Sequence, residues 1–152
     1  MRKINVIIGI KQIMVKVLAF CIFASCLAVS SAHAQGIKKE VVKFEEGKFS
    51  TIIENSLKGE QTVDYTVNVK KGQSLNVSMA TDNTANYFNI MEPEEEYVAI
   101  FNGSVEDNMF EDELQETGDY TIRVYLMRSA ARRNEKANYK LEIIVSNPGQ
   151  ED

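Results

Sequence analysis

The sequence predicts an all-β protein, an antiparallel β-sandwich of about seven or eight strands of the immunoglobulin or jelly-roll kind. Two observations lead to this prediction. Apolar and polar residues alternate in several segments of strand length, and turn residues separate these segments roughly every 8–12 residues. Residues 35–152 also lack the apolar spacing of an amphipathic helix. This combination is typical of antiparallel sheets that bury one face each.

The first 34 residues have the composition of a signal peptide. They hold four basic residues, no acidic residue, both cysteines of the chain and its single histidine. An apolar or small run follows the basic residues, and Ala32-His33-Ala34 fits the rule for signal-peptidase cleavage. We therefore expect residues 1–34 to be a signal peptide and residues 35–152 to be one exported β-sandwich domain, periplasmic in a Gram-negative bacterium.

The leader leaves alternatives open. The apolar run from Val17 to Val29 is 13 residues long, whereas a membrane-spanning helix needs about 20, so its length disfavours a permanent anchor. Lipidation of Cys26 is a second alternative, although Phe23 stands where lipoprotein signals usually have leucine. Met14 is an alternative start, because a lysine and the same apolar run follow it. After cleavage we expect no attachment to the membrane.

The composition of residues 35–152 excludes most enzyme chemistry. This part has 13 basic and 22 acidic side chains, a net charge of −9, and no Cys, His or Trp. Thiol nucleophiles, Ser-His-Asp triads and Cys/His zinc sites are therefore excluded. Nucleic acid is excluded as a partner because phosphates require a basic face. We expect no enzyme activity, no cofactor and no metal.

The first half of the domain contains four expected strands. Residues 35–40 are polar and are expected to fray. Apolar residues then indicate strands at 41–44 and 49–57, each followed by a glycine turn. Strict alternation predicts a strand at 63–69, and a Lys-Lys-Gly-Gln turn leads to a further alternating segment at 75–79. We expect these last two segments to pair as a hairpin.

The second half of the domain contains four more expected strands. Residues 87–91 form a short apolar segment, and 97–101 form a continuous apolar run of strand length. The acidic segment 102–113 is rich in turn residues. Alternation then predicts strands at 120–126 and 139–145.

Tyrosines in the domain are interpreted as structural residues. Tyr120 follows a Gly-Asp pair at the start of a late strand, where a tyrosine hydroxyl commonly bonds across a corner of a sandwich. Tyr65, Tyr87, Tyr97 and Tyr125 are expected in the core or on strand faces.

The acidic segments Glu92–Glu96 and Glu106–Glu113 are the first candidate site. Paired carboxylates can serve acid–base catalysis or bind calcium. However, Met109 and Phe110 interrupt the second segment, which has no glycine of a calcium loop. We therefore interpret both segments as a solvated surface, with no catalytic residue and no metal.

The second candidate site is the basic loop between the last two expected strands. Residues 128–136 contain four bases and one acid, a local charge of +3. If the loop forms one helical turn, Arg128 and Arg132 point the same way. Arginine forks bind carboxylates in a bidentate manner, so such a loop suits an acidic site. The alternative is an ordinary charged loop that balances the acidic surface.

Several segments taken together carry a resemblance to a known family. They are Val69–Gln73, Gly118–Val124, Arg128, Ala131-Arg132, Asn134 and Tyr139–Ile143. In this order the chain resembles the periplasmic inhibitors of goose-type (g-type) lysozyme, over about residues 41–145. The Arg-x-x-x-Arg spacing between the last two strands is the more specific part of the resemblance.

The resemblance implies a β-sandwich that blocks the cleft of a g-type lysozyme with a loop, and it maps the inserted arginines onto Arg128 and Arg132. We expect a monomer or weak homodimer, with Arg133 and Lys136 at the rim of the contact. The family also uses an aromatic residue from a preceding loop. Here that loop, Leu57–Gln61 with Gly59 and Glu60, has no aromatic residue. The implied contact set is therefore incomplete, and we expect weaker inhibition.

A different class of function remains as the alternative. The domain could be an exported module that binds carbohydrate or peptide, of the prepeptidase C-terminal type. Such a module would need exposed aromatic residues on one strand face, and the absence of tryptophan disfavours it. A lipoprotein scaffold is a third interpretation and depends on Cys26.

Overall fold

The computed structural model describes residues 36–147. The expected signal peptide, its cleavage, the alternative lipidation of Cys26 and the alternative start at Met14 all concern residues outside this range. No helix within the described range is both long and apolar enough to pass through a bilayer.

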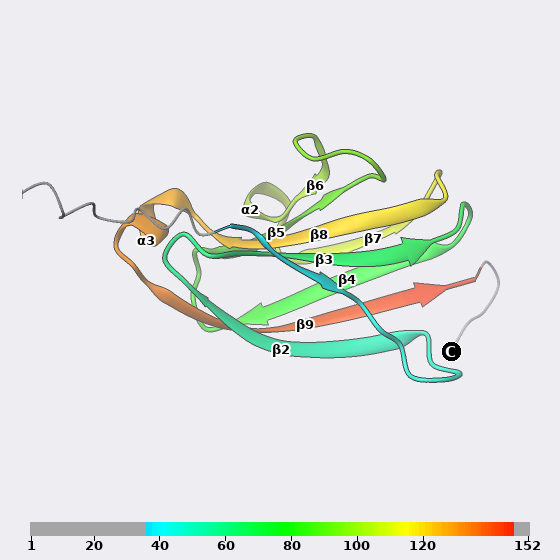
Figure 1. The fold of residues 1–152 in the computed structure, drawn as a ribbon, viewed down its shortest axis with the longest axis horizontal. Coiled ribbons are helices and arrows are strands. Elements are labelled where there is room, and N and C mark those ends of the chain that lie inside the picture. Colours follow the sequence, from blue (N-terminus) through cyan, green and yellow to red (C-terminus); the bar gives the residue numbers. More distant parts are fainter. Residues whose placement is uncertain (1–35, 148–152) are drawn as a thin grey trace, which may run out of the picture. The chain divides into compact units, whose positions relative to one another are not determined.

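The described residues form two β-sheets that lie face to face (Figure 1). The five-stranded sheet has the order β1-β3-β8-β5-β6 and the four-stranded sheet the order β2-β9-β4-β7. This confirms the predicted all-β sandwich, with nine strands in residues 36–147. The elements are β1 (Lys38–Val41), β2 (Ser50–Lys58), β3 (Thr62–Val69), β4 (Ser74–Thr81), β5 (Asn86–Met91), β6 (Ala99–Asn102), α2 (Gly103–Glu106), β7 (Met109–Glu113), β8 (Gly118–Leu126), α3 (Arg128–Arg132) and β9 (Lys136–Ser146).

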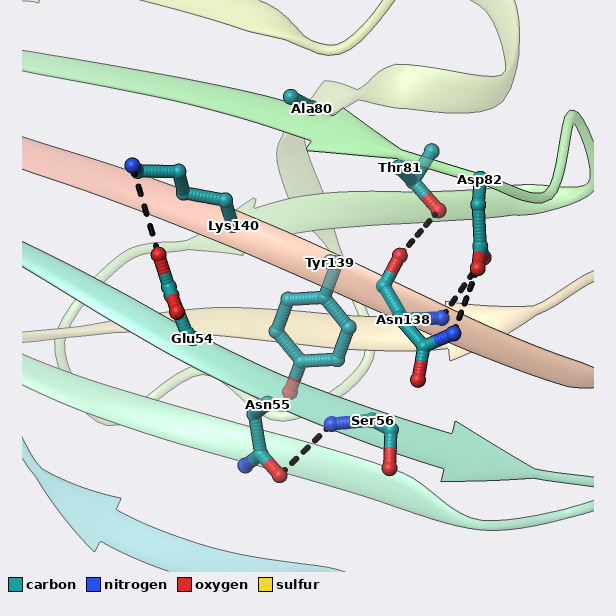
Figure 2. Close-up of a pocket in the computed structure, with 9 residues that line it drawn as sticks. All are labelled: Glu54, Asn55, Ser56, Ala80, Thr81, Asp82, Asn138, Tyr139 and Lys140. Carbon is teal, nitrogen blue, oxygen red and sulfur yellow. Dashed lines mark hydrogen bonds and ion pairs between the residues drawn. The ribbon is translucent and has the colours of Figure 1, made fainter.

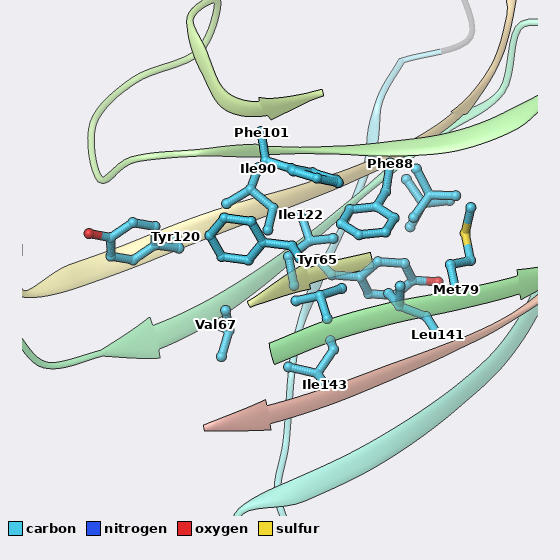
Figure 3. Packing of buried hydrophobic residues seen from close by; sticks show 14 of the residues in the cluster. Tyr65, Val67, Met79, Phe88, Ile90, Phe101, Tyr120, Ile122, Leu141 and Ile143 are labelled. Atoms are coloured by element: carbon cyan, nitrogen blue, oxygen red, sulfur yellow. The ribbon is translucent and has the colours of Figure 1, made fainter. Parts of the chain in front are cut away.

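The core lies between the two sheets and contains the apolar residues of the alternating strands (Figure 3). Alternate side chains of β3, β4, β8 and β9 are buried, as the period of two predicts. The ring of Phe101 in β6 packs between Phe88 in β5 and Phe110 in β7, with ring centroids 5.1 and 5.3 Å away. These three rings join the two sheets beneath β6.

The expected hairpin of residues 63–69 and 75–79 is wrong. Both segments are strands, β3 and β4, but β3 pairs with β1 and β8 while β4 pairs with β7 and β9. The Lys-Lys-Gly-Gln turn between them therefore passes from one sheet to the other. Alternation shows which face of a strand is buried, but both sheets bury the same kind of face, so it does not show which sheet a strand joins.

The beginning of the domain also differs from the expectation. Residues 38–40, expected to fray, belong to β1, and the strand ends at Val41 rather than at 44. β1 runs parallel to β3, with Lys39 opposite Asp64. A parallel pair is possible here because β2, which separates β1 and β3 in the sequence, lies in the other sheet.

The acidic part of the second half is more ordered than predicted. Residues 103–106 form α2 and residues 109–113 form β7, in which Phe110 is buried. The strand expected at 97–101 begins only at Ala99. Tyr97, expected in the core or on a strand face, lies in the β5–β6 loop and is 89% exposed.

Two tyrosine arrangements stabilise the sandwich. The Tyr120 hydroxyl donates to the carbonyl of Glu116 at 3.3 Å, which confirms the predicted corner. In the core, the hydroxyls of Tyr65 (β3) and Tyr139 (β9) lie 2.7 Å apart, and Asn55 Nδ2 donates to the Tyr65 hydroxyl. Burial, followed by this hydrogen bond, raises the pKa of Tyr139. Because β3 and β9 belong to different sheets, the bond links the sheets through a satisfied polar pair.

A buried ion pair lies on the outer side of the five-stranded sheet. Asp64 in β3 is 3% exposed and stands opposite Arg123 in β8. Arg123 donates from Nε to Oδ1 at 2.7 Å and from Nη2 to Oδ2 at 2.9 Å. Its Nη1 donates to the carbonyl of Glu96, so the same side chain holds the β5–β6 loop over the sheet.

Replacing Asp64 by asparagine should lower the free energy of unfolding by about 2–3 kcal/mol, because Arg123 would lose the carboxylate that compensates its partly buried charge. Urea denaturation measures this loss. Asp119→Asn is the matched control, because it removes a carboxylate that accepts from Asn68 at an exposed site. It should cost less than about 0.5 kcal/mol. Equal losses for the two variants would contradict this role of the ion pair.

Candidate functional site

The basic loop predicted from the sequence lies at one end of the sandwich, where β8 passes into β9 (Figure 1). Its first part is the helical turn α3. The Ala131 amide donates to the Met127 carbonyl at 2.9 Å, and the Met127 amide donates to the carbonyl of Ala85 in the β4–β5 loop. Ala130 is fully buried. The small residue thus lets the turn lie directly on the core, while its other side faces solvent.

Arg128 and Arg132 occupy the first and last positions of α3, and both are exposed. Four residues apart on one helical turn, their side chains leave the same side of the helix. Within residues 36–147, neither guanidinium has an ion pair or a hydrogen-bonded side chain. The predicted juxtaposition of the two arginines is therefore present, and both side chains are available to a partner.

Arg133 differs from these two arginines because it is paired. Its Nε and Nη2 donate to Oε1 of Glu135 at 2.7 and 2.6 Å. The other carboxylate oxygen of Glu135 accepts from Asn83 Nδ2 at 3.0 Å. The hydrogen bond from Asn83, and then that from Arg133, lower the pKa of Glu135. Through its pairing with Glu135, Arg133 thus helps to hold the β8–β9 loop in place. Lys136 begins β9 and is exposed, opposite Lys58 of β2.

The turn containing Gly59 and Glu60 packs against the basic loop. The Gly59 amide donates to the carbonyl of Glu135 at 2.9 Å. Gly59 is buried and has a φ of +60°, and a Cβ there would lie 2.7 Å from Oδ1 of Asn134. Glu60 is exposed. Of this pair, only Glu60 has an exposed side chain, while the backbone of Gly59 joins the two loops. We call α3, with Arg133 and Lys136, the basic tip.

The sequence reasoning missed the residues that hold the basic tip in place. Asn86 is fully buried; its Nδ2 donates to the Tyr125 carbonyl, and its Oδ1 accepts from Thr81. Asp82 accepts two hydrogen bonds from Asn138, which lower its pKa. Residues 82–86 have the polar composition of a loop, but the Tyr125 and Asn138 partners lie more than 30 residues away in sequence and have no local signal.

No family model matches the chain. An "Inhibitor of g-type lysozyme" from Escherichia coli (strain K12) is 30% identical over 121 residues, which cover 78% of this chain and 89% of that protein.

The chain belongs to the family of g-type lysozyme inhibitors.

Solved structures are similar to this family member. A periplasmic lysozyme inhibitor of g-type lysozyme from Aeromonas hydrophila has 29% identity and a TM-score of 0.68, covering 72% of this chain and 97% of its own. The corresponding protein of Salmonella Typhimurium, at 23% identity and a TM-score of 0.58 over 73% of this chain and all of its own, shares the fold.

The module type considered as an alternative gives a weaker likeness. The pre-peptidase C-terminal domain of a collagenase from Bacillus anthracis has 17% identity and a TM-score of 0.50, covering 73% of this chain and 97% of its own. This likeness concerns the fold alone.

A depression of about 680 Å³ lies on the four-stranded sheet of this family member, across β2, β9 and β4 (Figure 2). An ion pair between Lys140 and Glu54 lies at one side and the Asp82–Asn138 hydrogen bonds at the other. Tyr139 is its one aromatic lining residue, and this ring is 4% exposed. The depression therefore offers no aromatic platform for a sugar ring. Residues 36–147 also contain no group of three or more His, Cys, Asp or Glu residues placed to hold a metal.

Gly59→Ala should destabilise the protein more than Gly47→Ala. Both glycines have a positive φ, of +60° and +75°, so an alanine costs about 1–2 kcal/mol of backbone strain at either position. A Cβ at Gly47 meets no atom within 4 Å, whereas at Gly59 it would lie 2.7 Å from Oδ1 of the exposed Asn134. This side chain would have to rotate away, so the extra loss at Gly59 should be small. The extra loss, measured by thermal denaturation, reports the packing of the two loops. Equal losses would show that this packing contributes nothing to stability.

Proposed function

We propose that this protein inhibits a g-type lysozyme in the periplasm, and that its basic tip enters the substrate cleft of the enzyme. The observation that carries the proposal is the pair of exposed arginines, Arg128 and Arg132, which have no partner within the described residues. Membership of the inhibitor family supports the target class. The leader composition and the periplasmic relatives support the location.

The chemistry of a glycosidase cleft suits this arginine pair. Such clefts carry carboxylates, at least one of which must be ionised for catalysis. A guanidinium binds a carboxylate through two parallel hydrogen bonds. Arg128 and Arg132 would therefore occupy groups that otherwise hold sugar, and the small Ser129 and Ala131 beside them leave room for the walls of a cleft.

The fixed geometry of the tip favours tight binding. α3 is held by Ala130 in the core, by the Met127–Ala85 hydrogen bond and by the Gly59–Glu135 hydrogen bond. A surface already in its bound conformation loses less entropy on association. The exposed Glu60 stands where the family resemblance implies an aromatic contact, so we expect weaker inhibition than that of a protein with the aromatic residue.

The arginine pair is tested by Arg128→Ala, Arg132→Ala and the double variant. Removing one guanidinium from a desolvated pair should cost about 2–5 kcal/mol of binding free energy, mainly as faster dissociation. Inhibition of cell-wall lysis and surface plasmon resonance with a g-type lysozyme measure the effect.

Arg133→Ala is the matched control for these variants, since Arg133 is already paired with Glu135; it should cost less than about 1 kcal/mol. If the wild-type protein inhibits and both arginine variants keep full potency, the tip is not the inhibitory element. If the wild type binds no lysozyme, the proposed target is wrong.

Long-range attraction should depend on the acidic body rather than on the tip. Glu106 is exposed and has no cationic partner within the described residues. Glu106→Gln should lower the association rate and reduce its dependence on salt, with little effect on dissociation, because exposed charges act mainly on the encounter. Stopped-flow association at two salt concentrations tests this. An unchanged association rate at low salt would contradict the expectation.

A further inference from the structure

The charge of the domain is unevenly distributed along the chain. Between Lys71 and Arg123 there is no lysine or arginine, and this stretch contains 12 of the 22 acidic residues. It forms β4, β5, β6, α2 and β7. Within residues 36–147, no acid of the β5–β6 loop or of α2 forms a salt bridge. Arg123 reaches this loop only through the Glu96 carbonyl, and its salt bridge is with Asp64.

Large apolar side chains are exposed among these acids. Tyr97 is 89%, Val105 79% and Val98 65% exposed. Tyr97 and Val98 lie in the β5–β6 loop and Val105 lies in α2, at the two ends of the edge strand β6. We call these three residues, with Glu94, Glu96 and Glu106, the acidic shoulder. A solvated face would explain its carboxylates but not its exposed apolar side chains.

The shoulder is held in one conformation. Oε1 of Glu95 accepts hydrogen bonds from the amides of Glu96, Tyr97 and Val98 at 2.9, 2.9 and 3.2 Å. These bonds lower the pKa of Glu95, with that from Tyr97 the strongest cause. The Glu96 carbonyl accepts from Arg123. Beneath the strand, Phe101 packs against two aromatic rings of the core. Because this backbone is held and a tyrosine side chain has only two torsions, Tyr97 loses little entropy when it binds.

The α2 end of the shoulder and the basic tip border the same loop. Asn108, two residues after α2, donates from Nδ2 to the carbonyl of Asn86 at 3.0 Å. The amide of Met127, the residue before α3, donates to the carbonyl of Ala85. Residue 85 ends the β4–β5 loop and residue 86 begins β5, so α2 and α3 both lie near the start of β5 (Figure 1). A protein that covers the basic tip is therefore placed to reach the shoulder as well.

We propose that the acidic shoulder is a second contact surface of the inhibitor, one that binds a cationic surface with an apolar centre outside the cleft of the same lysozyme. The inference rests on the proposed function. A cationic surface on the lysozyme would complement the carboxylates of the shoulder and speed association. A second copy of this chain fits less well, since two shoulders repel each other and the domain carries a net charge of −9.

The two surfaces then have different effects. The basic tip blocks the cleft, whereas the shoulder holds the complex together through Tyr97 and Val105. Tyrosine is one of the residue types that most often dominate binding energy, so Tyr97 is the main anchor, and Val105 adds buried apolar area. Loss of the anchors should shorten the lifetime of the complex, in contrast to Glu106→Gln, which should change its formation.

The test measures binding of a g-type lysozyme to the full mature protein by surface plasmon resonance. The variants are Tyr97→Ser with Val105→Ser, the conservative Tyr97→Phe, and Arg128→Ala with Arg132→Ala. Val41→Ser is the matched control, because Val41 is 72% exposed on β1, at the other edge of the five-stranded sheet. Circular dichroism and thermal denaturation check that each variant folds.

We expect Tyr97→Ser with Val105→Ser to raise the dissociation rate about tenfold or more, with Tyr97→Phe and Val41→Ser close to the wild type. The double arginine variant should still bind weakly without inhibiting, and adding the two shoulder changes should abolish that binding. If the wild type inhibits and the shoulder variant has wild-type rates, the second contact is wrong and the proposed function stands. If the wild type binds no lysozyme, both are wrong. A shoulder variant that alters self-association alone, in sedimentation analysis, would assign the surface to a second copy and overturn the proposal.

Discussion

The chain of this protein changes sheet at almost every connection, and the candidate site depends on this constraint. Each strand must bury one face against the other sheet, and among the nine strands only β5 and β6 are consecutive within a sheet. Three crossing connections, β2–β3, β4–β5 and β8–β9, meet at the end where α3 lies. Because each connection passes from one sheet to the other, the β8–β9 connection forms backbone hydrogen bonds with the other two. The β5–β6 hairpin, which does not cross, projects its loop outward instead.

Much of the strand content could be predicted from the sequence, because a strand that buries one face has alternating apolar and polar residues. Segments 63–69, 120–126 and 139–145 coincide closely with β3, β8 and β9. The sheet membership of a strand has no such signal, so the hairpin of β3 and β4 was a wrong prediction. The run from Tyr97 to Phe101 was also misleading, since the exposed Tyr97 and Val98 are of the same residue types as a core strand. In β7, three acidic residues follow the single buried residue, Phe110. The segment therefore lacks the apolar–polar alternation that indicates a strand.

The candidate site was predictable where its signal is local. Two arginines four residues apart, with small residues between them, indicate a helical turn with a basic face, and α3 has this form. The pairing of Arg133 with Glu135 is almost as local, yet spacing alone did not show which of the arginines would be paired. The contacts of Gly59 with Glu135 and of Asn83 with Glu135 join residues 76 and 52 positions apart. Such contacts follow from the topology, which the sequence pattern did not supply.

In the turn at Gly59, the residue that the fold requires is next to a residue whose side chain is exposed. The fold uses the backbone of this turn and the missing Cβ of Gly59, whereas the Glu60 side chain makes no contact that the sandwich requires. Mutation at position 60 is therefore nearly free of structural penalty. Such a position can change between lineages while the scaffold keeps its stability.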